Sequence, residues 1–136
     1  MIFDHETAIL ARLAAKCAGG SVFKGSFDAV DMSDDSPAPV VCQIVLDQIN
    51  VTGQTGKHAR ALLTYSCSVY TDLYRATTPQ KTAAGQLLTD AIQALVGWEY
   101  SPGVEVEITD GQSTGSDGRL LRLSFGFTIP AHFAGT

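Results

Sequence analysis

The sequence predicts a single α+β domain in which two amphipathic helices cover one face of a largely antiparallel sheet. Three changes of periodicity support this prediction. Apolar and polar residues alternate from Ala59 to Leu73, a helical period of 3.6 residues follows from Thr78 to Gly97, and two more alternating segments come last. The chain has 136 residues, which is enough for one hydrophobic core, so we interpret residues 1–136 as one domain.

The first helix is predicted from about His5 to Ala18. Asp4 is the expected N-cap, and Glu6 adds negative charge to the first turn, where the helix dipole favours it. Gly19 and Gly20 supply the stop signal. The apolar side of this helix would consist of Ala8, Ile9, Leu13 and Cys17.

The next part of the chain alternates between strand and loop patterns. Residues 21–27 are consistent with a short strand or an extended edge, and the acidic, proline-containing segment 28–39 predicts a loop. Apolar residues occupy both parities from Val40 to Ile49. This pattern predicts a strand in the sheet interior, or one whose outer face meets another subunit. Residues 50–58 are polar and glycine-rich, and we expect a hairpin tip that projects from the body.

A second helix follows the alternating strand that ends at Leu73. Thr78 is the expected N-cap, and Pro79 would occupy the first helical position, where a missing N–H does no harm. Gly97 ends the pattern. Trp98 and Tyr100 are expected to close over the end of this helix.

The chain finishes with a predicted hairpin. Pro102 and Gly103 would start it, and its strands would include Val104–Ile108 and Leu121–Ile129, joined by a long loop over residues 110–118. Glu, Arg, Ser and Thr alternate with the apolar residues of these strands. The second face of the sheet is therefore predicted to be either solvated or a polar interface.

Composition and charge exclude several classes of function. Hydrophobic residues make up 45% of the chain and charged residues 17%, as in a globular protein with few surface charges. The formal net charge is −5, so an extended surface that follows nucleic-acid phosphates is not expected. The sequence shows neither a signal peptide nor an apolar run of about 20 residues, so we expect cytosolic synthesis and no membrane insertion.

No cofactor or metal site is expected from the cysteines and histidines. Cys17, Cys42 and Cys67 fall at apolar positions without paired spacing, which indicates buried hydrophobic side chains rather than zinc ligands. His5, His58 and His132 are scattered along the sequence. A calcium loop starting at Asp110 would lack the required carboxylates.

Two short strings resemble catalytic motifs but lack their structural context. Gly56-Lys57 has neither the upstream glycine nor the Ser or Thr of a phosphate-binding loop, and it leads into a strand. Residues 111–115 match G-x-S-x-G, but the hydrolase motif requires a strand-to-helix turn, and this segment lies in a predicted hairpin loop. We therefore predict no catalytic residue and no enzymatic activity.

Two groups of charged residues are candidates for contacts with a partner. Lys57, His58 and Arg60 form a basic group at the base of the predicted hairpin tip, which could meet an acidic partner surface. Asp34 and Asp35 lie in the acidic loop, which could order against a neighbouring chain. Each group could also be a solvated loop.

Nearly the whole chain resembles the tail terminator proteins of long-tailed bacteriophages, also called minor tail proteins. The resemblance rests on length, element order and three segments: the opening helix FDHETAILARLAAK, the strand PAPVVCQIVLDQI, and the final LLRLSFGFTIPA. Members of this family are α+β domains that form a ring, typically hexameric, on the head-proximal end of the tail tube. The ring ends tube polymerisation and provides a surface that docks to the head.

The resemblance implies a structural role in a phage or prophage virion. The implied partners are further copies of the chain in a ring, the tail tube protein and head–tail connector proteins. The implied location is the host bacterial cytoplasm during assembly and then the tail or neck of the virion. Lys57, His58 and Arg60 would contact the tube or neck, and Asp34 and Asp35 would lie at a subunit or end-face contact. Two alternatives remain: a head–tail connector component, and an unrelated small-molecule-binding or enzymatic α+β domain.

Overall fold

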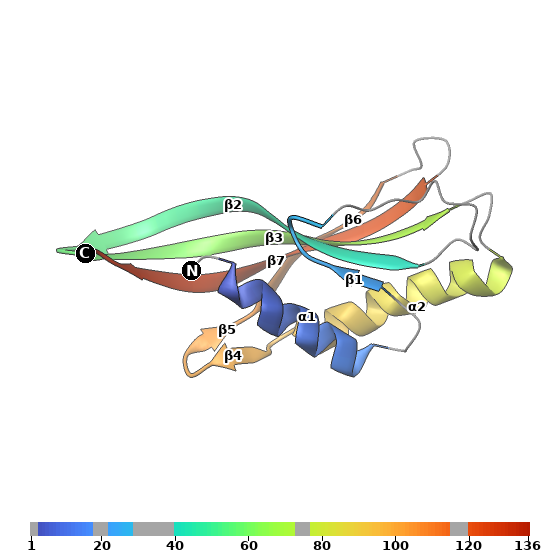
Figure 1. The fold of residues 1–136 in the computed structure, drawn as a ribbon, viewed down its shortest axis with the longest axis horizontal. Helices are drawn as coiled ribbons and strands as arrows, with labels where there is room; N and C mark the ends of the chain where they lie inside the picture. Colours follow the sequence, from blue (N-terminus) through green and yellow to red (C-terminus); the bar gives the residue numbers. More distant parts are fainter. Residues whose placement is uncertain (1–2, 18–21, 29–39, 73–76, 115–119) are drawn as a thin grey trace.

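The computed structural model describes residues 3–17, 22–28, 40–72, 77–114 and 120–136. Within them, helices and strands follow one another in the order seen in Figure 1: α1 (Asp4–Lys16), β1 (Val22–Lys24), β2 (Val41–Thr55), β3 (His58–Asp72), α2 (Thr78–Leu95), β4 (Glu99–Ser101), β5 (Val104–Glu105), β6 (Glu107–Thr114) and β7 (Leu120–Ala134). Both helices lie on the same side of a long twisted sheet (Figure 1). The predicted α+β class is confirmed.

The main sheet has the strand order β1-β2-β3-β7-β6. The pairs β2–β3, β3–β7 and β6–β7 are antiparallel, whereas the short β1 is parallel to β2. β1 pairs only with Val41–Gln43, so it places just the first part of β2 in the sheet interior. The predicted interior position of Val40–Ile49 is therefore correct only for its first residues, which are buried on both faces. Beyond Gln43, β2 pairs only with β3 within the described part of the chain.

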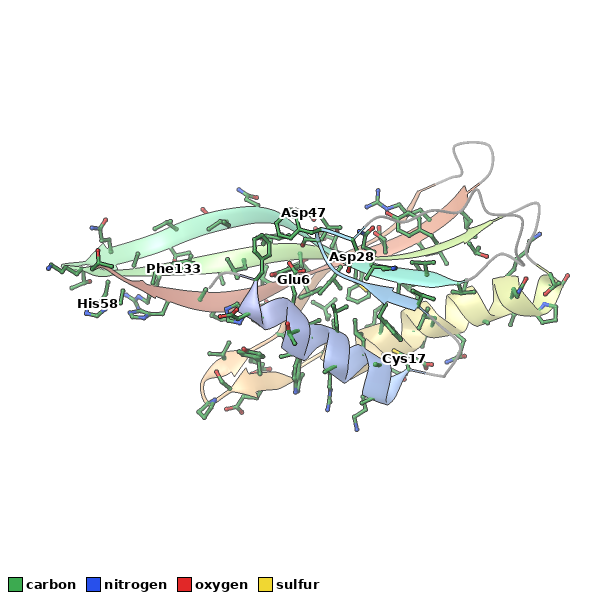
Figure 2. All side chains as sticks on the ribbon, in the orientation of Figure 1. Glu6, Cys17, Asp28, Asp47, His58 and Phe133 are labelled. Carbon is green, nitrogen blue, oxygen red and sulfur yellow. The ribbon has the colours of Figure 1, made fainter. Side chains whose placement is uncertain are left out.

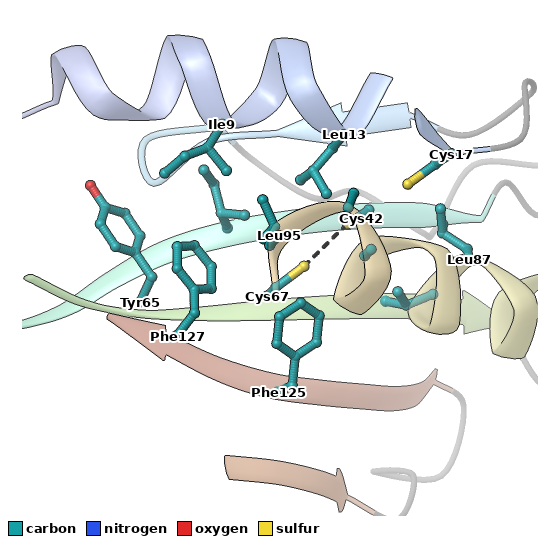
Figure 3. Close-up of a cluster of buried hydrophobic side chains, with 14 of the residues drawn as sticks. Ile9, Leu13, Cys17, Cys42, Tyr65, Cys67, Leu87, Leu95, Phe125 and Phe127 are labelled. Carbon is teal, nitrogen blue, oxygen red and sulfur yellow. Dashed lines mark hydrogen bonds between the residues drawn. The ribbon is translucent and has the colours of Figure 1, made fainter. Parts of the chain in front are cut away.

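The core lies between the helices and the face of the sheet that carries the odd-numbered residues of β3 and β7 (Figure 3). Tyr65 and Phe127 are paired across these two strands and stack with ring centroids 5.2 Å apart and planes 6° apart. Ile9 and Leu13 of α1 and Leu95 of α2 are fully buried in the same cluster. The predicted alternation thus marks the face that the helices cover.

The two helix N-termini correct the predicted caps. α1 begins at Asp4, with Phe3 in the N-cap position and no side-chain cap, so Asp4 lies inside the first turn. For α2 the N-cap is Thr77 rather than Thr78. The Thr77 hydroxyl accepts a hydrogen bond from the Gln80 N–H, and the Gln80 side chain accepts one from the Thr77 N–H. This reciprocal capping box, which leaves Pro79 in the second helical position, explains the shift.

The predicted hairpin between β2 and β3 is present, but its loop is much shorter than expected. β2 continues through residues 50–55, and only Gly56 and Lys57 separate the paired residues Thr55 and His58. Gly56 has φ +58°, and a glycine with positive φ at the first position of a two-residue turn suits the twist of the strands. Residues 50–55 were expected in a loop because most of them are polar or glycine, yet their backbone continues the ladder.

The C-terminal hairpin also differs from the prediction. Pro102 and Gly103 form the turn of a separate two-stranded sheet, β4–β5, and do not start the main hairpin. β6 extends to Thr114, so much of the predicted loop over residues 110–118 is strand; residues 115–119 lie outside the described part. Trp98 and Tyr100 pack against the core and on α1: Tyr100 meets the His5 ring, and the Arg12 guanidinium lies over Trp98.

The predicted burial of the cysteines is confirmed. Cys17, Cys42 and Cys67 are all buried and unbridged, and the Sγ atoms of Cys42 and Cys67 lie 3.5 Å apart (Figure 3). Neither helix within the described ranges is both long and apolar enough to cross a membrane.

Candidate partner-binding arm

The three central strands continue beyond the helices as a projecting arm, which we define as residues 48–63 and 129–136 (Figure 1). It comprises the end of β2, the Gly56–Lys57 turn, the start of β3 and the end of β7. A register shift at Asp47 marks its base on β2. At its tip, the Gly135 N–H donates to the Lys57 carbonyl, so the end of the chain is held against the hairpin turn. Backbone pairing runs along the whole arm, and at its base Leu63 and Ile129 are also buried in the core.

The arm differs in charge from the rest of the protein. Lys57 and Arg60 are its only lysine and arginine, and all 14 aspartates and glutamates of the chain lie elsewhere. Both cations are exposed. The arm is thus a cationic projection from an acidic protein, and an acidic surface is the partner that it complements.

Three large apolar side chains are exposed on one face of the arm, whose base residues Leu63 and Ile129 are buried in the core. Ile49 and Val51 on β2 are 48% and 60% exposed, and Phe133 on β7 is 37% exposed. Strand register places them on the face that carries the core: Ile49 pairs with Leu63, Val51 with Ala61, and Phe133 with Ala59. Farther along the sheet the same face is covered by the helices. Large apolar side chains exposed on one face are candidates for a contact surface.

A cavity of about 280 Å³ also lies on the arm. Arg60 and His132 contribute polar groups to its lining, and the other lining residues are mostly apolar: Thr52, Ala61, Leu62, Val104, Pro130 and Ala131. Its apolar lining and cationic border would suit an apolar side chain next to a carboxylate.

The structure brings together two histidines that are far apart in the sequence. His58 begins β3, His132 lies near the end of β7, and their rings stack with centroids 5.1 Å apart and planes 23° apart. Nδ1 of His58 lies 3.2 Å from Nε2 of His132. The expectation of scattered histidines was therefore wrong for this pair, because the β3–β7 register overrides their separation. Figure 2 shows His58 at the tip of the arm, with Phe133 nearby on β7.

The predicted contact residues fall into two groups. Lys57, His58 and Arg60 all lie at the tip of the arm, and Arg60 is the cross-strand neighbour of His132. Asp34 and Asp35 lie outside the described residues. The sequence prediction missed Phe133 and His132, although the alternation of β7 continues past Ile129 and could have indicated them.

A second hollow, of about 260 Å³, lies on the face of the sheet opposite the helices. Hydroxyl side chains line much of it, with Asp47 and Asp110 at its borders and Arg122 among its lining residues. The Arg122 Nε–H donates to the Ser68 hydroxyl at 3.1 Å, and its guanidinium lies 5.9 Å from the Tyr70 ring. Arg122 is thus held against the sheet, and this face offers hydrogen-bonding groups to solvent or to a partner, as the sequence predicts.

The fold has a solved counterpart. The chain is similar in structure to the sheath/tube terminator, in its extended state, of an extracellular contractile injection system known as PVC. The similarity has a TM-score of 0.55 at 17% sequence identity and covers 100% of this chain and 60% of the terminator. No family model and no curated protein sequence matches the chain. The chain therefore has a tail-terminator-like fold and spans about three-fifths of the length of that terminator.

Proposed function

We propose that this protein is a structural tail protein that caps the head-proximal end of a phage or prophage tail tube. In this role it ends tube polymerisation and offers a docking surface for the head. The observation that carries the proposal is the structural similarity to a sheath/tube terminator over the whole of this chain. Such a role works through complementary surfaces and requires no chemical reaction.

The uncovered arm supports this proposal. A capping protein needs a surface that stays exposed until its target is present, and the arm offers Ile49, Val51 and Phe133 beside a cationic tip. We infer that Lys57, His58 and Arg60 contact an acidic surface of the tube or the neck. Copies of the chain would form a closed ring, hexameric in the proposal, by repeating a head-to-tail contact. Asp34 and Asp35 would lie at a subunit or end-face contact.

Deleting the gene from a producing phage tests the role. A terminator deletion should yield overlong tails without heads by negative-stain electron microscopy, and the wild-type gene supplied in trans should restore normal virions. Tails of normal length that lack heads would instead indicate a neck connector and would overturn the capping role. Normal virions from the deletion would exclude both.

The same complementation assay tests the arm. The double variant Lys57→Glu/Arg60→Glu should restore infectious particles poorly, because charge reversal slows an electrostatically favoured encounter by roughly tenfold or more at low salt. A matched control, Lys16→Glu/Lys81→Glu, changes the net charge equally at exposed positions on the two helices. Equal complementation by both double variants would remove the tip of the arm from the contact.

A further inference from the structure

We propose that His58 and His132 form a binding site for a late first-row divalent transition metal, with Zn²⁺ as the representative ion. The inference rests on the geometry of these two side chains and is independent of the proposed function. Imidazole nitrogen is a preferred ligand of Zn²⁺, Ni²⁺ and Cu²⁺. The arm would thus have a metal-binding site in addition to its contact surface.

The nitrogen separation fits chelation. Nδ1 of His58 and Nε2 of His132 are 3.2 Å apart. A zinc ion bonded to both nitrogens at about 2.0–2.1 Å would subtend an angle of roughly 100° between them, close to the tetrahedral value.

The ring positions fit the same geometry. For a metal that lies in line with each nitrogen, the ring centres would be roughly 3.2 Å from the ion and therefore about 5 Å from each other at that angle. The observed centroid separation is 5.1 Å. A straight hydrogen bond of the same nitrogen separation would place the centres roughly 5.5 Å apart, given the usual near-linear geometry. The observed separation of the ring centres therefore agrees with the chelate value rather than with that of a straight hydrogen bond.

The strands hold the two histidines in place. Arg60 is opposite His132 in the β3–β7 ladder, and His58 is opposite Ala134, so the histidines are diagonal neighbours on one face of the sheet. Both side chains are exposed to solvent, from which an ion can enter. Of the two cations at the tip of the arm, Arg60 is directed away from the histidines, because one of its guanidinium nitrogens lies near Gly53 of β2, across β3 from β7.

The site would have two protein ligands. Among the described residues, no group of three or more His, Cys, Asp or Glu could hold a metal ion. Water would therefore complete the coordination shell, or a donor from another molecule that meets the arm. An incomplete shell predicts weaker binding than in a structural zinc site with four protein ligands.

Isothermal titration calorimetry with Zn²⁺ on the full chain tests the proposal. We expect saturable 1:1 binding that weakens about a hundredfold in His58→Ala and in His132→Ala, because the second imidazole of a chelate binds intramolecularly. Since a ligand of the native state stabilises it, Zn²⁺ should raise the melting temperature of the wild type and not of these variants. The control His5→Ala removes a histidine elsewhere and should bind as the wild type does.

Nuclear magnetic resonance supplies an independent readout. Zn²⁺ should shift the ring proton resonances of His58 and His132 and leave those of His5 in place. Binding that survives either alanine substitution, or the lack of saturable binding by a folded wild type, would overturn the proposal. Because both histidines are exposed, circular dichroism should show native folding of each variant; His58→Gln and His132→Gln provide second variants if an alanine variant does not fold.

Discussion

The Glu6 carboxylate accepts two hydrogen bonds from Ser26, one from the backbone N–H at 2.9 Å and one from the hydroxyl at 2.6 Å. The same hydroxyl accepts a hydrogen bond from the Leu46 N–H at 2.9 Å. Glu6 belongs to α1, Ser26 follows β1, and Leu46 lies in β2. This chain of bonds joins three elements at the point where the arm begins. The first-turn carboxylate expected to act on the helix dipole is thus turned inward, and only 7% exposed.

Removing this carboxylate should destabilise the whole fold. Glu6→Ala leaves the Ser26 donors without their acceptor, and hydrogen bonds to charged groups contribute about 1.5–3 kcal/mol. We therefore expect a loss of about 2–3 kcal/mol in the free energy of unfolding, measured by denaturant titration. Glu107→Ala, at an exposed strand position, should change it by less than about 0.5 kcal/mol. Equal effects of the two substitutions would contradict a role for the Glu6–Ser26 bonds.

Removing the Tyr65 hydroxyl, unlike removing the Glu6 carboxylate, should not lower the free energy of unfolding at neutral pH. This hydroxyl is buried and makes no close hydrogen bond among the described residues, although the Glu6 carboxylate lies near enough to interact with it. Burial, followed by the negative charge of Glu6, raises the pKa of Tyr65 well above its usual range. The folded state then retains this proton after the unfolded state has released it, so stability should fall as pH rises above about 10, the ordinary pKa of tyrosine.

Tyr65→Phe should therefore keep or increase stability at pH 7, since it removes a buried hydroxyl that makes no close hydrogen bond among the described residues. It should also flatten the decline in the free energy of unfolding above pH 10. Denaturant titrations from pH 7 to 11 on both proteins measure the two effects. Tyr70→Phe is the control, because its partly exposed ring lies on the other face of the sheet. A large loss of stability in Tyr65→Phe at neutral pH would show that the hydroxyl has a partner.

The three cysteines should be chemically inert in the folded protein. Burial raises the pKa of Cys17 to about 11, and the hydrogen-bond contact with Cys42, followed by burial, raises that of Cys67. Because the thiolate is the reactive form, a thiol reagent at pH 8 should modify native protein slowly and all three cysteines rapidly in denaturant. Fast modification of native protein at Cys42 or Cys67 would contradict the buried arrangement in Figure 3.

Replacing an exposed apolar side chain of the arm should weaken binding to a partner without changing the stability of the fold. Val51→Thr should alter the free energy of unfolding by less than about 0.5 kcal/mol, because the side chain is 60% exposed. Burying it against a partner would contribute about 1 kcal/mol, so affinity for tail tubes should fall about fivefold. Val96→Thr is the matched control, since Val96 is 58% exposed but lies beyond the end of α2. Co-sedimentation with purified tubes measures both; equal binding by the two variants would remove Val51 from the contact.

Replacing Gly126 of β7 by a larger residue should destabilise the protein unless Thr109 is also changed. A Cβ atom at this position would lie 2.6 Å from the Thr109 hydroxyl oxygen, in the part of β6 where its register with β7 shifts. Gly126→Ala should therefore cost about 1–3 kcal/mol through overpacking, as measured by thermal unfolding. Adding Thr109→Ala should recover most of this loss. Gly111→Ala is the control because its Cβ would meet nothing within 4 Å; a cost in that variant equal to the Gly126→Ala cost would argue against the clash.

Much of the fold could be predicted from local patterns. The alternation of β3 and the helical period of α2 identify the residues that face the core, such as Tyr65 and Leu95, because burial repeats with the geometry of each element. The ends of elements were harder to predict. Thr77 and Thr78 are both suitable caps, and only the reciprocal bonds with Gln80 distinguish them.

The sequence by itself determined the α+β class, the face covered by the helices, the burial of the cysteines and the position of the Lys57–Arg60 group at a hairpin. The tertiary structure alone decided the length of the arm, the pairing of His58 with His132 and the inward position of Glu6. Hydrophobic periodicity reports whether each side chain is buried along one element. The backbone ladder between strands instead depends on register and tolerates polar side chains, so it can bring together residues that no local pattern relates.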